Sequence, residues 1–274
     1  MSKVIAVALP KGGVGKTTTA VNLAASFSVS GKRTLLVDLD PLGASALSLG
    51  FTEGAIKSGL LEIFNFVSSA QSAIHRTEMP LLDFIPSNVH SLQMEDRLTR
   101  LADNRTLLKN MLRGITCHYD YVVLDCPPML RGLSTNALTA ADTVLMPVKP
   151  GYFSLDAVDK LFKHLEHLRE VANKHLQVEG ILVTMHEPHA RVSEITLREL
   201  TAKYSTYLFN TLIPNNSSLS EASFYGKPIL LYKQNSRGAE AYRALAREII
   251  DRDHRDHQTV PVRPALLEAI SQEA

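Results

Sequence analysis

Residues 10–18 read Pro10-Lys11-Gly12-Gly13-Val14-Gly15-Lys16-Thr17-Thr18, and this stretch decides the fold. A short apolar run at 4–9 precedes it and has the β-branched bias of a buried strand. Apolar residues at helical spacing follow it over 18–30. Between a strand and a helix, glycines let backbone N–H groups converge on an anion, and the helix start adds its positive dipole end. The stretch therefore predicts a phosphate-binding loop.

Two side chains of this loop have distinct expected tasks. We expect the Lys16 ammonium to reach the β- and γ-phosphates of a nucleotide and the Thr17 hydroxyl to ligate Mg²⁺. The other residues of the loop bring backbone amides to the same anion. The further nucleotide contacts expected here are Gly12, Gly13, Val14, Gly15 and Thr18.

Length and composition are those of an ordinary globular protein. The chain has 274 residues, of which 45% are hydrophobic and 21% charged, and its net charge is +1. The near-neutral charge excludes a polybasic protein, so any nucleic-acid binding must come from a local patch. Two cysteines, Cys117 and Cys126, cannot form a disulfide framework. Since no apolar stretch approaches the ~20 residues of a membrane span, we expect a cytoplasmic location.

Strand-like and helix-like segments alternate along the chain, which indicates a parallel sheet covered on both faces. We predict an α/β protein with the three-layer P-loop NTPase fold and a mostly parallel sheet of about seven or eight strands. One domain is expected over 1–252, with a flexible C-terminal tail over 253–274. The expected strands are 4–9, 33–38, 82–86, 119–128, 142–147, 178–185 and 207–213, and the expected helices are 18–30, 58–67, 92–115, 155–172, 192–204, 217–225 and 236–252.

Acidic residues end two of the expected strands. Asp38 and Asp40 follow the second strand, and Asp125 follows the apolar run at 121–124. In open α/β sheets, ligands bind beyond the carboxyl ends of the strands. Asp125 has the position of a Walker B aspartate, which holds Mg²⁺ through water. The three carboxylates are therefore expected beside the phosphate loop.

The octapeptide at 11–18, KGGVGKTT, resembles the deviant Walker A motif of the ParA/MinD family of ATPases. The resemblance implies that Lys11 reaches across a dimer interface to the nucleotide of a second subunit. It also implies that Asp40 orients or activates the attacking water and that Asp38 supports the magnesium shell. The expected catalytic residues are Lys11, Lys16 and Asp40, and the expected metal residues are Thr17, Asp38 and Asp125.

The resemblance extends over residues 3–250. GILVTM at 180–185 and LSEASFYGKP at 219–228 are similar to later signatures of the family, and 129–140, with Asn136, resembles its second switch region. By this resemblance Met185, Pro214 and Asn216 contact the adenine. The chain departs from the family at Leu42, where a glutamine is usual, and at Pro10.

The implied function is a nucleotide-gated switch. ATP and Mg²⁺ would join two copies into a homodimer that binds DNA non-specifically, and a ParB-like or cargo-adaptor protein would stimulate a slow ATPase. The cargo would be a chromosome, a plasmid or a large protein assembly, and the protein would be nucleoid-associated. The candidate DNA contacts are Arg191, Arg198, Lys203, Lys227, Lys233, Arg237, Arg243 and Arg247.

Three other functions fit parts of the sequence. A MinD-like membrane switch would need a basic amphipathic helix at its C-terminus, whereas residues 264–274 are short and acidic, so no membrane is expected. A metabolic ATP-dependent enzyme of the same fold would need a substrate pocket at the dimer face. A pure interaction protein would bind ATP without hydrolysing it.

Overall fold

The computed structural model describes residues 2–52 and 54–256, and a seven-stranded sheet runs through this part of the chain. The strand order is β3-β4-β2-β5-β1-β6-β7. Every pairing is parallel except the short antiparallel edge pair β3–β4, which confirms the predicted mostly parallel sheet. The strands are β1 (Lys3–Val7), β2 (Thr34–Asp38), β3 (His75–Arg76), β4 (Leu82–Ile85), β5 (Tyr121–Asp125), β6 (Thr143–Val148) and β7 (Gln177–Val183).

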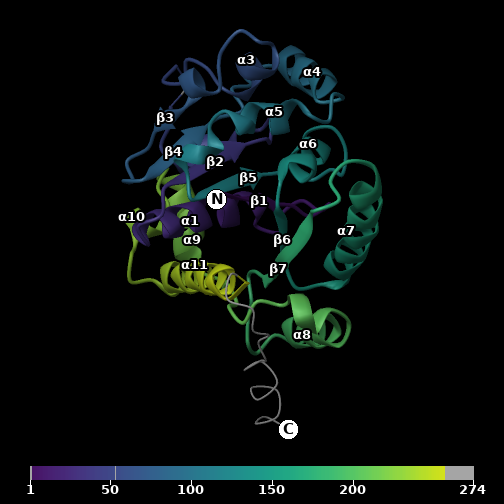
Figure 1. The fold of residues 1–274 in the computed structure, drawn as a ribbon. Coiled ribbons are helices and arrows are strands. Elements are labelled where there is room, and N and C mark those ends of the chain that lie inside the picture. The colour runs from purple at the N-terminus through teal and green to yellow at the C-terminus, as the bar shows by residue number, and fades with distance from the viewer. Residues whose placement is uncertain (1, 53, 257–274) are drawn as a thin grey trace.

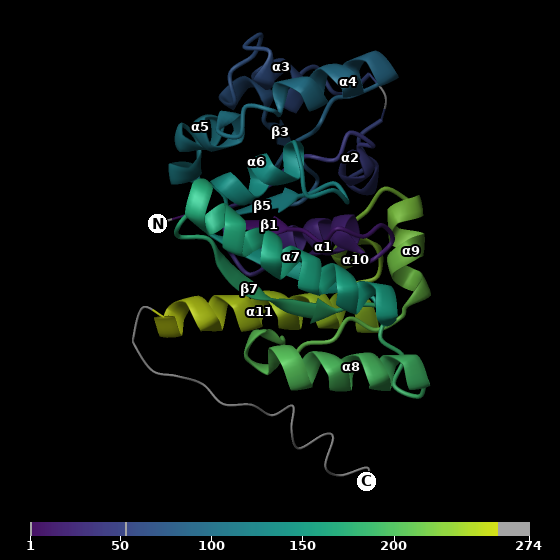
Figure 2. The same ribbon diagram turned by 90° about the vertical axis from the view of Figure 1, so that its right-hand side faces the viewer.

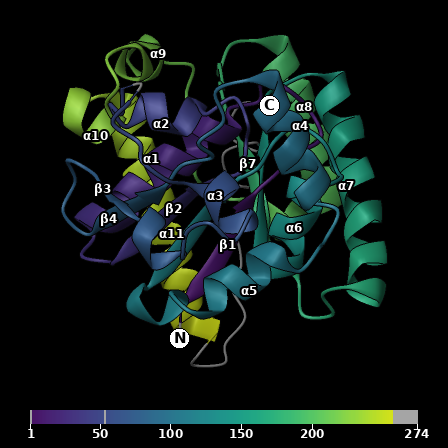
Figure 3. The same cartoon turned by 90° about the horizontal axis from the view of Figure 1, so that it is seen from above.

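Helices cover both faces of this sheet, as Figures 1 and 3 show. Successive strand residues point to opposite faces, so Ile5 and Val7 pack in one core and Val4 and Ala6 in the other. The first face carries α1 (Lys16–Val29), α2 (Ala44–Ser48), α9 (Ser217–Phe224), α10 (Ile229–Tyr232) and α11 (Arg237–Asp256). The second carries α3 (Leu60–Phe64), α4 (Leu92–Leu101), α5 (Leu107–Arg113), α6 (Leu133–Ala140), α7 (Tyr152–Val171) and α8 (Arg191–Tyr204).

The stretch 92–115 was expected to be one helix, and this prediction is wrong because the chain breaks between α4 and α5. Asn104 favours a turn there, since its Oδ1 accepts bonds from the amide and hydroxyl of Thr106. Asn136 stabilises the break between the two helices. Its Nδ2 donates to Ala102 O at 2.7 Å and its Oδ1 accepts from Leu108 N at 3.2 Å. Asn136 is fully buried, so its amide joins these helix ends.

The expected strand at 207–213 is also wrong. Its residues run parallel to β7 but form only the single bridge Ile181–Leu208 there. The reason is Glu248, whose carboxylate accepts the amides of Asn210 and Thr211 at 2.9 and 3.0 Å. Those amides are thereby withdrawn from any ladder. The helices α2, α6 and α10 and the edge strand β3 were not predicted.

The last helix, α11, was expected to end at 252 but continues to Asp256. Asp253, in the predicted tail, accepts a hydrogen bond from Tyr121 Oη at 2.8 Å and pairs with Lys3. These contacts fasten α11 to the sheet. The rest of the predicted tail, 257–274, lies outside the described residues. No helix in the described part of the chain is both long and apolar enough for a membrane span.

Replacing the buried amide of Asn136 tests the α4–α5 break. Asn136→Ala leaves the buried Ala102 carbonyl and Leu108 amide without their partner, so we expect a loss of about 2–4 kcal/mol in the free energy of unfolding. Urea denaturation measures this change in the free energy of unfolding. Asn110→Ala, on the exposed side of α5, is the control. We expect it to change the free energy of unfolding by less than about 0.5 kcal/mol. Equal effects of both variants would contradict the assigned role of Asn136.

Candidate active site

The phosphate loop joins the end of β1 to the first residue of α1. Gly13 and Gly15 have φ angles of 69° and 87°, in the left-handed region that favours glycine. Thr184, just after β7, donates from its Oγ1 to Val14 O at 2.8 Å and so ties the loop to another strand of the sheet. The loop is therefore fixed at both flanks. This fixed loop presents its amides at the N-terminus of α1, which is the arrangement that binds phosphate.

Lys16 lies inside the loop. Its side chain is nearly buried, with 7% of the residue exposed, and its Nζ donates to Lys11 O at 2.7 Å. Burial lowers the pKa of this ammonium, while the Asp125 carboxylate acts in the opposite direction. The charge of Lys16 is thus held where the loop amides converge. The contact of Lys16 with a phosphate stays a prediction.

Asp38 and Asp125 lie side by side at the ends of β2 and β5, where they are paired in register. Both are fully buried. Asp38 accepts the Asp40 amide at 3.0 Å, and Asp125 accepts the Ser45 hydroxyl at 2.8 Å. One oxygen of each, Asp38 Oδ2 and Asp125 Oδ1, has no hydrogen-bond partner within the described residues.

Burial shifts the pKa values of both carboxylates upward. Burial, followed by the charge of Asp125, raises the pKa of Asp38 well above its usual range. Burial also raises the pKa of Asp125 to about 6, although the hydrogen bond from Ser45 opposes the shift. Two buried carboxylate oxygens without a partner fit a divalent cation, because Mg²⁺ prefers oxygen ligands. The expected part of Thr17 in this metal site stays a prediction.

Asp40 and Lys11 lie nearer the surface. The Asp40 carboxylate accepts the Leu42 amide at 3.1 Å, and this turn leaves the Leu42 side chain 79% exposed. Lys11 points away from Lys16: its Nζ donates to Ser154 Oγ at 2.9 Å and lies 5.8 Å from the centre of the Phe153 ring. Within one protomer, therefore, only one of the two loop lysines faces the acids.

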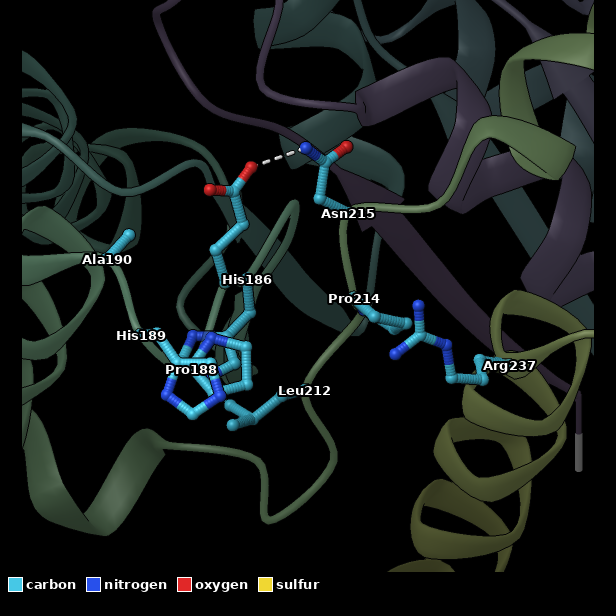
Figure 4. Close-up of a pocket in the computed structure, with 9 residues that line it drawn as sticks. His186, Pro188, His189, Ala190, Leu212, Pro214, Asn215 and Arg237 are labelled. Carbon is cyan, nitrogen blue, oxygen red and sulfur yellow. Dashed lines mark hydrogen bonds between the residues drawn. The ribbon is translucent and has the colours of Figure 1, made fainter.

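The segments expected to contact adenine meet at the carboxyl end of β7. Met185 has a positive φ of 51°, and the next residue exchanges backbone bonds with the 213–215 segment. Pro214 lines a cavity of about 440 Å³, shown in Figure 4, which the Asn215–Glu187 hydrogen bond of 2.5 Å borders. Asn216 instead caps α9 by accepting Ser218 N at 2.9 Å. The cavity lining is His186, Glu187, Pro188, His189, Ala190, Leu212, Pro214, Asn215 and Arg237.

The eight candidate DNA contacts lie on α8 and between α9 and the middle of α11. Both α8 and α11 are at the lower end of the molecule in Figures 1 and 2. Two of the charges are already paired: Arg198 with Glu194 and Lys203 with Asp159, each at 2.6 Å. Arg237 lines the cavity described above. The other five form no ion pair within residues 2–52 and 54–256: Arg191, Lys227, Lys233, Arg243 and Arg247.

Three residues of the site escaped prediction from the sequence. Ser45, Ser154 and Thr184 contact Asp125, Lys11 and Val14 respectively. Each contact joins segments far apart in the chain, and serine and threonine have no local pattern that marks such a role. The thiol of Cys126 is free and buried beside Asp125, and Cys117 is exposed.

These features define a P-loop NTPase fold. The sheet is mostly parallel, the glycine-rich loop follows β1, and acidic residues lie at the carboxyl ends of its strands. A family model described as an AAA domain matches residues 2–178. The chromosome partitioning protein ParA of Myxococcus xanthus is 37% identical over 253 residues, which cover 92% of this chain and 89% of that protein. The sporulation initiation inhibitor protein Soj of Bacillus subtilis is 37% identical over 249 residues, covering 91% and 98%.

Among solved structures, cobyrinic acid a,c-diamide synthase from Mycobacterium smegmatis, with bound ADP and magnesium, superposes with a TM-score of 0.80. It is 26% identical, and the match covers 96% of this chain and 100% of that one. The identity and coverage of the curated relatives decide the family. The chain belongs to the ParA/Soj group of the ParA/MinD family.

The acid pair makes stability depend on pH. Since the folded pKa values are raised, the pair favours folding below the ordinary carboxyl pKa of about 3.9, and this contribution is lost as pH rises through about 6. Asp38→Asn removes the repulsion. We expect it to raise the melting temperature of the ligand-free protein at pH 7 by about 2–4 °C per kcal/mol gained, with a smaller gain near pH 4.

Differential scanning calorimetry across this pH range measures the effect. Asp103→Asn changes the same charge at an exposed position between α4 and α5, and we expect it to leave the pH profile unaltered. If Asp38→Asn raised the melting temperature as much near pH 4 as at pH 7, the electrostatic account would be contradicted.

Proposed function

We propose that the protein is an ATP-hydrolysing switch that dimerises on ATP and Mg²⁺ and positions a cargo. The observation that carries the proposal is a pair of buried oxygens, Asp38 Oδ2 and Asp125 Oδ1, beside a glycine loop that encloses Lys16. Neither oxygen has a hydrogen-bond partner within residues 2–52 and 54–256. The bound ADP and magnesium of the structural relative and the partitioning names of the sequence relatives support it.

The residues have complementary parts in this reaction. The loop amides and Lys16 would hold the β- and γ-phosphates, and Thr17, Asp38 and Asp125 would hold Mg²⁺, directly or through water. The metal would offset negative charge that develops on the transferred phosphoryl group. Asp40, at the half-exposed mouth, would orient the attacking water and accept its proton. Lys11 of a second copy would bring a further positive charge to the phosphates.

Asp40→Ala tests the hydrolytic step separately from binding. We expect the phosphate-release rate to fall by about 100-fold or more, as for loss of a general base, while ATP-dependent dimerisation persists, because the loop and the metal acids are intact. Malachite-green assays and analytical ultracentrifugation with ATP give the two readouts. Asp103→Ala is the matched control. Unchanged turnover in Asp40→Ala would remove Asp40 from the assigned role.

The proposed surface for the dimer is non-specific DNA, and a ParB-like or cargo-adaptor protein is the proposed stimulator. Arg243 and Arg247, which form no ion pair among the described residues, lie on α11, and Arg191 lies at the start of α8. A two-fold dimer would present two copies of each, and non-specific affinity grows with the number of neutralised phosphates. Such a protein would be found with the nucleoid.

The double substitution Arg243→Ala/Arg247→Ala tests this surface. Loss of two phosphate contacts per protomer should weaken ATP-dependent DNA binding and lower the slope of log affinity against log salt by about two or more. Fluorescence anisotropy with labelled duplexes at several salt concentrations measures both. Arg100→Ala/Arg113→Ala makes the same charge change on α4 and α5. Equal losses in both variants, or binding that ignores ATP, would contradict the proposal.

The likeness to the diamide synthase favours a second candidate function, namely ATP-dependent activation of a carboxylic acid. The two functions differ in what turnover requires. A positioning switch hydrolyses ATP without any added acid, and DNA or a protein partner changes its rate. A synthetase turns over only with its substrate. The same phosphate-release assay on the unmodified protein separates the two.

A further inference from the structure

A second cavity, of about 210 Å³, lies beside the acidic edge of the sheet. It is bounded by α2, by the segment 51–56 and by the segment 86–90 that follows β4. It is separate from the cavity of Figure 4, because the two have no lining residue in common. We name it the α2 cavity.

The walls of the α2 cavity are held by the core of the protein. The ring of Phe51, which lines it, lies 5.4 Å from the ring of the fully buried Phe84. On the opposite wall the buried Asn88 amide bonds Glu62 and His90, each at 2.9 Å. A ligand therefore meets walls that are already formed, which lowers the entropy cost of binding.

Two leucines that line the cavity stand in solvent. Leu42 is 79% exposed and Leu47 is 64% exposed, so they lie at the opening. Behind them the wall is apolar at Ala46, Phe51 and Ile56. An apolar ligand would cover this surface and displace the water that contacts it, and the loss of that contact with water favours binding.

Charge and volume decide the class of ligand. Within residues 2–52 and 54–256, no lysine, arginine, aspartate or glutamate lines the cavity. A charged ligand would leave water without a counter-charge, which is costly, so the ligand is neutral. An apolar cavity of about 150 Å³ holds benzene, so the larger α2 cavity has room for one or two fused rings. That volume leaves little room for a peptide backbone, which favours a free molecule.

His90 restricts the class further. Because Asn88 Nδ2 donates to the Glu62 carboxylate, Asn88 Oδ1 faces His90 and accepts from its Nε2. In the neutral imidazole the other nitrogen, Nδ1, is then an acceptor. His90 is exposed, and its Nδ1 forms no hydrogen bond within the described part of the chain. A ring that carries one N–H or O–H group can donate to it.

We propose that the α2 cavity binds a free neutral aromatic molecule with one N–H or O–H group, an indole or a phenol, and that this ligand slows ATP turnover. The second part rests on the proposed function. The first part concerns one protomer without nucleotide and does not depend on that function.

The path from the cavity to the acids is short. Ser45 on α2 donates to Asp125 at 2.8 Å, and the amide of Leu42 donates to the Asp40 carboxylate at 3.1 Å. The next amide, that of Gly43, donates to the Asp40 carbonyl at 3.0 Å. A ligand packed against Leu42 and α2 holds this turn. The Asp40 carboxylate then stays bonded to the Leu42 amide and is less available to the attacking water.

The binding test uses indole and the protein without nucleotide. The chain contains no tryptophan, so fluorescence excited at the red edge of the indole band comes from the ligand alone, and its emission moves to shorter wavelength on leaving water. We expect a dissociation constant of about 0.1–1 mM for a ligand of about nine non-hydrogen atoms. An unshifted emission up to the solubility limit of indole would overturn the site.

Two leucine variants locate the bound ligand. Leu47→Asp places a charge at the opening, and we expect it to weaken indole binding about tenfold or more. Leu92→Asp makes the same change at a leucine that is 79% exposed on α4 and does not line the cavity, and it should leave binding unaltered. Equal weakening in both variants would overturn the location.

Two analogues of indole test its recognition. 1-Methylindole lacks the N–H donor and should bind about fivefold more weakly, the weight of one net hydrogen bond. In His90→Phe the two ligands should bind equally, and a preference for indole that persisted there would overturn the role of His90. N-acetyltryptophanamide should bind more weakly than indole. Tighter binding would overturn the free molecule in favour of a protein side chain.

The turnover test separates the proposal from the proposed function. Saturating indole should slow phosphate release by the unmodified protein about fivefold, at the lower end of ordinary coupling between two sites, and should not affect Leu47→Asp. Absence of any ATP hydrolysis would overturn the proposed function and leave the binding result intact. Hydrolysis at the same rate with indole bound would overturn the regulatory part, while the proposed function stands.

Discussion

The structure depends on the repulsion between two buried carboxylates, which folding does not relieve. Asp38 and Asp125 are buried beside each other at the ends of two neighbouring strands, and one oxygen of each has no partner among the described residues. Burying a charge without a counter-charge costs free energy, which is why both pKa values are raised. The closest lysine in the loop does not neutralise them, because Lys16 donates to the Lys11 carbonyl. A site of this kind gains stability when a cation and its anionic ligand arrive together.

The start of α7 connects this site to the rest of the second helical layer. Ser154 contacts Lys11, and three residues earlier the Gly151 amide donates to Thr196 Oγ1 on α8 at 3.0 Å. Thr196 is itself buried and bonds back to Val192 O. A continuous set of hydrogen bonds therefore runs from the phosphate loop through α7 to the helix that carries Arg191. Such a path can couple the phosphate loop energetically to α8. Double-mutant cycles along it measure the coupling energy.

Local patterns predicted the parts of the fold that local physics decides. The glycine loop, the strand-end acids Asp38 and Asp125 and the alternation of strands and helices needed only spacing and residue type. Long-range partners decided the rest. Asn136 splits one apolar stripe into two helices, and Glu248 withdraws the amides of a β-prone segment from the sheet. The direction of Lys11 belongs to the same class, since a hydroxyl 143 residues away sets it.

The two ends of the sheet show how the same residue types serve scaffold and site. At the amino end, Lys3 pairs with Glu179 at 2.7 Å and with Asp253, and the hydroxyls of Thr143 and Tyr121 bond the same two acids. Burial would lower the pKa of Lys3, but its two acidic partners outweigh burial and raise it. That network is complete, and it fastens α11 to β1, β5 and β7. At the carboxyl end two acids and a lysine are again buried together, but the lysine bonds a carbonyl instead of a carboxylate. Satisfied charges make one end of the sheet rigid, whereas the unsatisfied charges at the other end make it responsive to a ligand. The free-energy cost of burying charges without partners thus falls at the edge of the sheet where a bound ligand can offset it.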